Sequence, residues 1–152
     1  MVMSTGADGE AIFSRTRVDA FDVALGKAAI TSGRHAWTVE AAVGYVGVAT
    51  WSCSKRVYPC NDQTGAWAVS VSRFILLCGA ASSHKAKDWT ALRSTGAAAK
   101  CLVNVLLDMD ARTLSFSRDD GPMRVAYIGL PESVHPYLCS GNVGEVFKVL
   151  LK

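Results

Sequence analysis

The feature that most constrains the fold is an alternation of apolar and polar side chains with a period of two residues. Residues 35–43 carry apolar side chains at every second position from Trp37 to Val43, with Thr38 and Glu40 between them. This alternation predicts a β-strand with one buried face. Comparable short apolar runs recur at residues 45–51, 67–71, 74–78, 102–107, 113–117, 123–128, 134–138 and 146–151. Regular short strands separated by turns predict an all-β antiparallel sandwich or barrel.

Two turns give the first strand connections. Gly44 separates two apolar runs and predicts a hairpin between residues 35–43 and 45–51. Asp108 and Asp110 lie between residues 102–107 and 113–117, and aspartate side chains readily accept hydrogen bonds from turn N–H groups. We therefore expect a second hairpin there. The two segments with some helical character, residues 80–87 and 94–100, are short, and we expect both to be loops.

The length and composition favour one globular domain. The chain has 152 residues, of which 50% are hydrophobic and 19% charged. The net charge of +3 is not gathered into a basic stripe, so we expect no nucleic-acid partner. No apolar run approaches the roughly 20 residues of a membrane span, so we expect no membrane partner either. We expect a monomer with an N-terminal tail at residues 1–9 and a single domain at residues 10–152.

The cysteines predict a compartment. They are odd in number and unevenly spaced, and the first residues do not form a signal peptide. We interpret them as reduced thiols, which predicts a cytoplasmic or nuclear protein. The five are Cys53, Cys60, Cys78, Cys101 and Cys139.

Several ordered segments resemble the SPRY domain family. They are residues 32–40, 46–50, 65–67, 107–110 with 113–116, 129–130 and 135–136. The likeness is strongest to SPRY domains of the SPRY-and-SOCS-box and F-box type, although we expect this chain to contain neither box. The resemblance implies a two-sheet antiparallel β-sandwich of the concanavalin type that binds another protein through loops at one rim.

The resemblance also implies where a ligand would bind. Arg15 matches a family arginine, and a guanidinium can donate paired hydrogen bonds to a carboxylate. Tyr58 matches a tyrosine that contacts ligand in the family, and Asn142 stands where close relatives carry a tryptophan. Each could instead be an ordinary surface, packing or turn residue. The candidate ligand-binding residues are Arg15, Arg17, Asp19, Tyr58, Pro59, Asn142 and Val143.

The charge near these segments predicts the partner's chemistry. Arg15, Arg17, Lys55 and Arg56 would make a positive rim, which favours an extended acidic peptide of a partner protein. The alternative is a lectin-like glycan-binding domain, for which Trp51 with Asn61 and Asp62 gives faint support.

We expect no enzyme, cofactor or metal. Cys53 and Cys60 could form a metal site with His84 or His135, but the two cysteines are spaced too widely for common zinc modules. No phosphate-binding glycine loop is present. His35 is expected to make a structural hydrogen bond.

The tryptophans divide into three groups. Trp37 and Trp67 lie on the apolar faces of predicted strands and are expected in the core. Trp51 lies at the end of a predicted strand and could lie in the core or at the rim. The pattern around Trp89 does not place it.

Overall fold

The structure is a computed structural model that describes residues 2–5, 11–14, 22–51, 65–76, 84–86, 89–92, 99–140 and 146–151. Within these ranges the chain forms eleven β-strands. They are β1 (Val2–Thr5), β2 (Ala11–Ser14), β3 (Asp22–Leu25), β4 (Arg34–Ala41), β5 (Tyr45–Ala49), β6 (Ala66–Ser70), β7 (Cys101–Asp108), β8 (Thr113–Arg118), β9 (Arg124–Tyr127), β10 (His135–Ser140) and β11 (Val146–Leu151). No helix in these ranges is long and apolar enough to cross a membrane.

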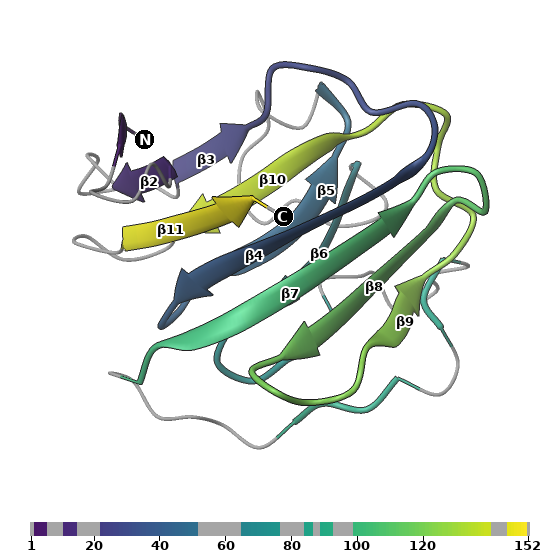
Figure 1. Cartoon of the computed structure of the whole chain (residues 1–152). Helices are drawn as coiled ribbons and strands as arrows, with labels where there is room; N and C mark the ends of the chain where they lie inside the picture. The colour runs from purple at the N-terminus through teal and green to yellow at the C-terminus, as the bar shows by residue number, and fades with distance from the viewer. Residues whose placement is uncertain are drawn as a thin grey trace.

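The strands form two stacked antiparallel sheets, seen in Figure 1. The larger sheet has seven strands in the order β1-β2-β11-β4-β7-β8-β9, and the smaller has four in the order β3-β10-β5-β6. The predicted all-β sandwich is therefore confirmed. Strands far apart in the chain become neighbours, since β11 lies between β2 and β4.

The hairpin at residues 108–113 forms as predicted. β7 pairs with β8 from Val103↔Arg118 to Asp108↔Thr113. Oδ1 of Asp108 accepts the N–H groups of Asp110 and Ala111 at 3.1 and 3.0 Å. The carboxylate thus closes the turn, which is the role that its position suggested.

The predicted hairpin at Gly44 is wrong. β4 belongs to the larger sheet, whereas β5 belongs to the smaller one and pairs with β10 and β6. Gly44 has a φ of 100°, and a Cβ on it would lie 2.6 Å from Cζ of Phe147. The chain therefore crosses between the sheets through a turn packed tightly on the core, which a side chain would obstruct.

The described part of the apolar run at residues 74–78, which is residues 74–76, enters the core without forming a strand. Residues 71–73 form a turn, Phe74 takes a positive φ of 56°, and Leu76 makes an isolated bridge to Val69. The ring of Phe74 is fully buried, with its centroid 5.5 Å from that of Trp89 and 6.4 Å from that of Phe116. Its burial replaces the backbone pairing that the pattern suggested.

β1 lies inside the segment that the sequence analysis assigns to an N-terminal tail. Residues 2–5 pair with β2 from Val2↔Ser14 to Thr5↔Ala11, at the edge of the larger sheet. The domain boundary near residue 10 stays a prediction.

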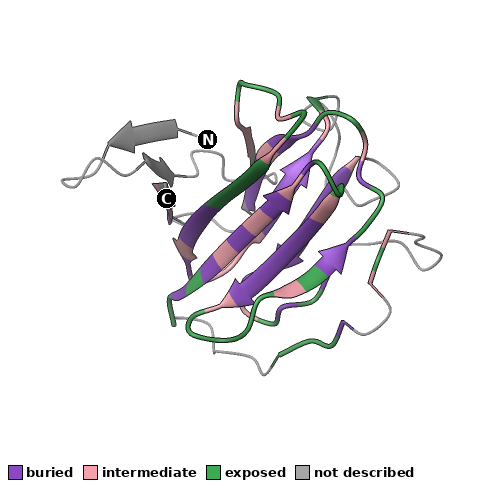
Figure 2. Ribbon diagram, turned by 45° about the vertical axis from the view of Figure 1, so that its right-hand side comes forward, coloured by how far each residue is buried: buried purple, intermediate pink, exposed green. Residues whose placement is uncertain are grey.

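The core lies between the two sheets, and Figure 2 shows buried residues along both layers. Trp37 and Trp67 are 7% and 4% exposed, so their predicted place in the core is confirmed. Trp89 is buried as well, and its Nε1 donates to the carbonyl of Phe74 at 3.0 Å.

One buried hydroxyl links the two sheets. Tyr127, at the end of β9, is 0% exposed, and its hydroxyl donates to the carbonyl of Ala68 on β6 at 2.7 Å. Ser70, two residues along β6, directs its N–H to Ile75 and away from β5. Because strand backbone groups alternate in direction, the Ala68 carbonyl also lies on the side of β6 that faces Ile75 and Leu76, and Tyr127 donates to it there.

Candidate binding site

The seven ligand-binding residues predicted from the sequence lie outside the described residues. They fall in residues 15–21, 52–64 and 141–145, so only the strand ends that bound these segments are placed.

Two of the three segments are bounded by neighbouring strand ends. Ser14, the last residue of β2, pairs with Val146, the first of β11. Asp22, the first residue of β3, pairs with Ser140, the last of β10. The strand ends that flank residues 15–21 and 141–145 therefore adjoin at one end of the sandwich, which we call the β10–β11 end.

The third segment is bounded at the opposite end of β10. Ala49 pairs with both His135 and Ala66, and the N–H of Thr50 donates to the carbonyl of Gly65 at 2.8 Å. Since β10 has 6 residues, its length separates these anchors from the β10–β11 end by roughly 20 Å.

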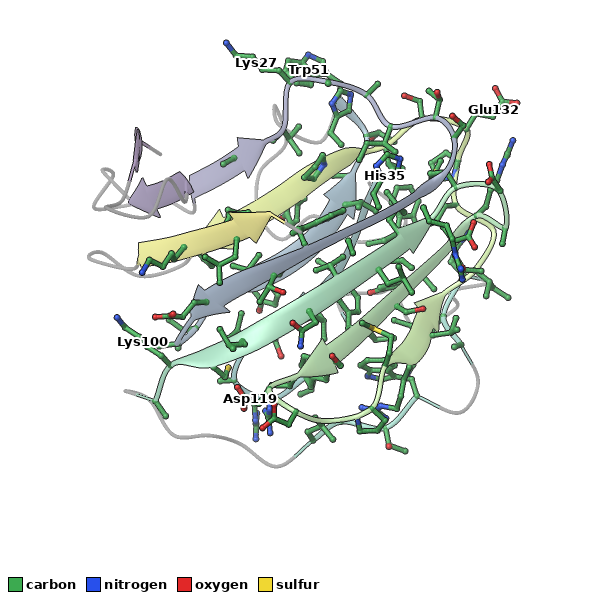
Figure 3. All side chains as sticks on the ribbon, in the orientation of Figure 1. Lys27, His35, Trp51, Lys100, Asp119 and Glu132 are labelled. Atoms are coloured by element: carbon green, nitrogen blue, oxygen red, sulfur yellow. The ribbon has the colours of Figure 1, made fainter. Side chains whose placement is uncertain are left out.

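Trp51 marks that opposite end, which we call the Trp51 end. Trp51 is 51% exposed, so of the two predicted positions, core or rim, it lies at the rim. Its ring centroid lies 5.0 Å from that of His135. Nδ1 of His135 donates to the carbonyl of Gly26 at 2.7 Å. Figure 3 shows Lys27 and Trp51 at this end, away from Lys100 and Asp119. An exposed tryptophan is a surface feature suited to recognition.

A pocket of about 540 Å³ opens between the sheets. β3, β10 and the chain after β3 form one wall, and β4 with β11 forms the other. Its size falls within the roughly 300–1,000 Å³ typical of ligand pockets. The lining is mostly apolar and consists of Ala24, Leu25, Gly26, Ile30, Arg34, His35, Ala36, Trp37, Val39, Pro136, Tyr137, Leu138 and Val149.

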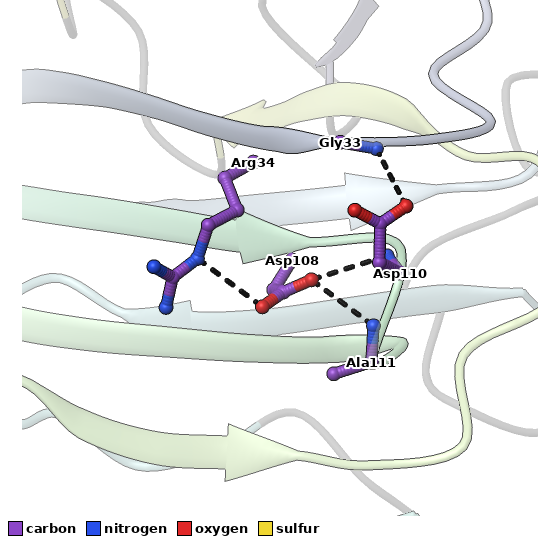
Figure 4. Close-up of polar contacts among 5 residues, drawn as sticks. All are labelled: Gly33, Arg34, Asp108, Asp110 and Ala111. Atoms are coloured by element: carbon purple, nitrogen blue, oxygen red, sulfur yellow. Dashed lines mark hydrogen bonds and ion pairs between the residues drawn. The ribbon is translucent and has the colours of Figure 1, made fainter.

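The start of β4 is held in place by polar contacts beside this pocket. Nε2 of His35 donates to the carbonyl of Ser32 at 2.8 Å, so the predicted structural role of His35 is confirmed. Nε of Arg34 lies 3.2 Å from Oδ2 of Asp108, and the N–H of Gly33 donates to Oδ1 of Asp110 at 3.0 Å (Figure 4).

These contacts also set the charge state of Asp108. The N–H of Ala111, and after it the guanidinium of Arg34 and the N–H of Asp110, hold the pKa of Asp108 below its ordinary value, against a smaller opposing effect of desolvation. Asp108 therefore stays ionised into mild acid and keeps Arg34 oriented.

The described cysteines are structural. Cys101 and Cys139 are free and buried. Sγ of Cys101 donates to the carbonyls of Ala41 and Val71, both at 3.6 Å, and burial, followed by the charge of Asp119, raises the pKa of this thiol. A neutral thiol is a poor nucleophile and a poor metal ligand. Within the described ranges, no group of three or more His, Cys, Asp or Glu residues could hold a metal ion.

The pocket is a feature that the sequence analysis did not find. Its walls join residues more than one hundred positions apart, such as Ala24 and Pro136. A period-two pattern shows which side chains face inward, but it does not show whether the side chains of the two sheets fill the space between them. At the Trp51 end, the sequence analysis had noted Trp51 itself, an aromatic residue at the end of a predicted strand.

A comparison with protein-family models shows the family to which the chain belongs. The model of the SPRY domain matches residues 34–152. The chain belongs to the SPRY domain family. This SPRY chain therefore belongs to a family of protein–protein interaction modules, as the resemblance in its sequence implied.

Solved structures support the same fold. The crystal structure of the SPRY domain of human HERC1 matches with a TM-score of 0.71 and 18% identity, covering 98% of this SPRY chain and 92% of that chain. The TRIM65 PSpry domain matches with a TM-score of 0.62 and 14% identity, covering 99% and 84%. No curated protein matches the chain.

Proposed function

We propose that this SPRY domain binds a short, extended, acidic segment of a partner protein through its rim loops. The residues proposed to contact it are those predicted from the sequence: Arg15, Arg17, Asp19, Tyr58, Pro59, Asn142 and Val143. We further propose that the domain spans residues 10–152, acts without catalysis, and works as a monomer in the cytoplasm or nucleus without binding nucleic acid or membranes.

Membership of the SPRY family is the observation that carries this proposal. Protein binding is the family's usual role, and a rigid sandwich with loops at its ends suits recognition. The adjoining strand ends at Ser14 and Val146 support joint contacts from residues 15–21 and 141–145. The basic residues Arg15, Arg17, Lys55 and Arg56 favour acidic ligands.

The first experiment compares baits in cell extract. The unaltered chain, Arg15→Ala, Tyr58→Ala and the double variant are immobilised after each has been shown to unfold at the same denaturant concentration. The double variant should lose the partners that the unaltered chain retains. Testing the single variants separately matters because the two segments are bounded by opposite ends of the sandwich. Recovery of the same proteins by all four baits would remove the proposed site.

The second experiment tests the charge preference. Affinity for acidic peptides should fall as salt rises from about 50 to 500 mM, because salt screens exposed charges. Matched basic peptides should bind more weakly at every salt concentration. A preference for the basic series, or binding that does not change with salt, would contradict the acidic specificity.

The exposed ring of Trp51 favours the alternative of glycan binding, since exposed aromatic rings can stack on sugar faces. A glycan array probed with the unaltered chain and Trp51→Ala separates the two functions. Specific glycan signals that vanish in Trp51→Ala would favour the lectin-like role over peptide binding.

A further inference from the structure

The outer face of the larger sheet carries exposed apolar side chains on β7 and beside β9. Opposite residues of paired strands share a face, so Leu106, Ser115 and Val125 lie together. Their face is turned away from the smaller sheet, since the neighbouring residues in β7 and β8 belong to the core. Leu102 and Met123 lie on the same face by the period of two, and Leu102, Met123 and Val125 are 37%, 43% and 44% exposed. We call this surface the β7–β9 face.

β8 contributes small side chains to the middle of this face. Ser115 and Ser117 are buried although they face outward, because the longer side chains of β7 and β9 rise on both sides of them. The hydroxyl of Ser117 accepts a hydrogen bond from Nδ2 of Asn104 at 3.0 Å. Figure 1 shows β7, β8 and β9 side by side. The β7–β9 face therefore consists of two rows of larger side chains with a strip of small ones between them.

An added strand has no place on this face. β7 pairs with β4 and β8, and β8 pairs with β7 and β9. The outer side of β9 is engaged as well, since the carbonyl of Ala126 accepts the N–H of Ala86 at 2.8 Å and the N–H of Ile128 donates to the carbonyl of His84 at 2.7 Å. A segment that lies on the face must therefore satisfy its own backbone hydrogen bonds, as an α-helix does.

The dimensions of the face fit one helix. β7 and β9 are two strand spacings apart, which is roughly 10 Å, and an α-helix with its side chains is about as wide. β8 has 6 residues and is roughly 20 Å long, which matches about 13 residues of helix. A helix whose apolar residues recur every three or four positions would place them on the rows formed by Leu102, Met123 and Val125.

One end of the face is acidic. Asp119 and Asp120 are exposed directly after β8, and none of the ion pairs among the described residues uses them. Arg118, the cation next to them in sequence, belongs to the core-facing side of β8, and its Nη1 donates to the carbonyl of Ser72 at 2.9 Å. Negative charge at this end favours the positive N-terminal end of a helix dipole and cationic side chains near it.

The opposite end of β8 is more nearly neutral. The carboxylates of Asp108 and Glu132 are each paired with an arginine, at 3.2 and 3.8 Å. Asp110 is then the one acid of the turn before β8 that no described ion pair uses. The greater negative charge therefore lies at Asp119 and Asp120, which sets a direction for a docked helix.

We propose that an amphipathic helix of a partner protein docks on the β7–β9 face along β8, with its N-terminal end, flanked by lysine or arginine, at Asp119 and Asp120. Its apolar stripe would cover Leu102, Met123 and Val125, in the manner of helices that bind through residues spaced three and four apart. This inference goes beyond the proposed function, because it concerns a second surface, made of described residues, and a cationic ligand. It does not depend on the rim loops.

The first test selects binders from a displayed library of helical peptides of about 14 residues, with leucines three and four positions apart and all other positions random. Selected peptides should bind Val125→Glu at least about tenfold more weakly than the unaltered chain. The matched control is Ile75→Glu, which changes a side chain that is 47% exposed after β6 of the smaller sheet and should leave the affinity unchanged. Unfolding midpoints show whether each variant is folded. If no selected peptide distinguishes the two variants, the inference is overturned.

The charge and the direction of the helix are tested together. Asp120→Lys should weaken the selected peptides several-fold, by an amount that shrinks as salt rises, and Asp110→Lys at the other end should weaken them less. A spin label on the peptide's N-terminus should broaden the NMR signal of the Gly121 amide more than that of the Ala111 amide. Equal or reversed broadening would refute the proposed direction.

Two further measurements separate a helix from other occupants. A proline placed at the centre of a selected peptide should weaken binding by at least about tenfold, because it breaks the helix. Unchanged binding would mean that the occupant is not helical. Sedimentation of the chain alone should give one species that Val125→Glu does not alter. A dimer that this variant dissociates would mean that a second copy covers the face, and would overturn the inference.

Failure here is distinguishable from failure of the rim-loop proposal. Arg15→Ala and Tyr58→Ala should bind the selected helices as tightly as the unaltered chain does, because neither residue belongs to the β7–β9 face. Conversely, Val125→Glu should retain the partners from cell extract that the rim variants lose. Loss of the selected helices in the rim variants would place their binding at the rim and contradict a second surface.

Discussion

The hydroxyl of Tyr127 provides a sharp test of how the two sheets are joined. Tyr127→Phe keeps the ring in the core and removes only the hydrogen bond to the carbonyl of Ala68. Both residues are 0% exposed, so water does not replace the lost bond. The Val69↔Leu76 bridge brings a second stretch of backbone to the same side of β6, so the expected loss is that of one ordinary hydrogen bond, about 1 kcal/mol. For a domain of this size, that loss corresponds to a fall in Tm of roughly 2–4 °C.

The assay is urea unfolding followed by tryptophan fluorescence, with calorimetry for Tm. The slope of unfolding free energy against urea should stay constant, because the hydroxyl does not change the area exposed on unfolding. The control is Ile128→Ala, the neighbouring residue, which is 46% exposed and should change the free energy of unfolding by less than about 0.5 kcal/mol. If Tyr127→Phe matched this control, the hydroxyl would not be a significant link between the sheets.

Three further predictions concern other parts of the sandwich. Gly47→Ala should lower the free energy of unfolding by about 3 kcal/mol or more, as measured by chemical denaturation. The added Cβ would meet the carbonyl oxygen of Trp67 and lie 2.6 Å from Cα of Ala68, and both atoms belong to the backbone of β6. The control is Gly121→Ala, which should be tolerated because its Cβ has only the carbonyl oxygen of Arg118 nearby, at 3.1 Å. Asp108 has a lowered pKa when folded, so its contribution to stability is present above the ordinary carboxyl pKa of 3.8 and is lost as the pH falls through the folded value. When the free energy of unfolding is measured at decreasing pH, the value for Asp108→Asn should approach that of the unaltered chain at low pH. A difference between the two proteins that stays constant with pH would contradict the lowered pKa. Cys101 should resist thiol reagents until the domain unfolds, as mass spectrometry of its peptide can measure, and labelling at the rate of an exposed thiol would contradict its raised pKa.

Much of the strand content was predictable because the chain alternates so regularly. Residues 146–151 were predicted as a strand, and β11 spans the same residues. The turn at Asp108 was also predictable, because its chemistry is local: one carboxylate accepts N–H groups within three residues.

The partner of each strand was less predictable. The run after Gly44 has the same pattern whether it folds back beside β4 or crosses to the other sheet. The difference arises from contacts with distant residues, such as Phe147 and Cys139. Phe74 shows a related limit, since its burial between Trp89 and Phe116 outweighs the strand tendency of its own segment.

The candidate site also has a part that the sequence predicted and a part that it did not. Sequence patterns named Arg15, Tyr58 and Asn142 through family resemblance, and these residues lie outside the described part of the chain. The inter-sheet pocket had no sequence signal, because its volume depends on how β3 and β10 stack on β4 and β11.

The position of β11 has a consequence for how the protein matures on the ribosome. β11 separates β2 from β4 in the larger sheet, so β1 and β2 join the rest of that sheet only after β11, the last described strand, has been synthesised. Such non-local pairing makes folding slow. Until β11 emerges, β2 and β4 each expose an unpaired edge, and the nascent chain is then most open to chaperones and to aggregation.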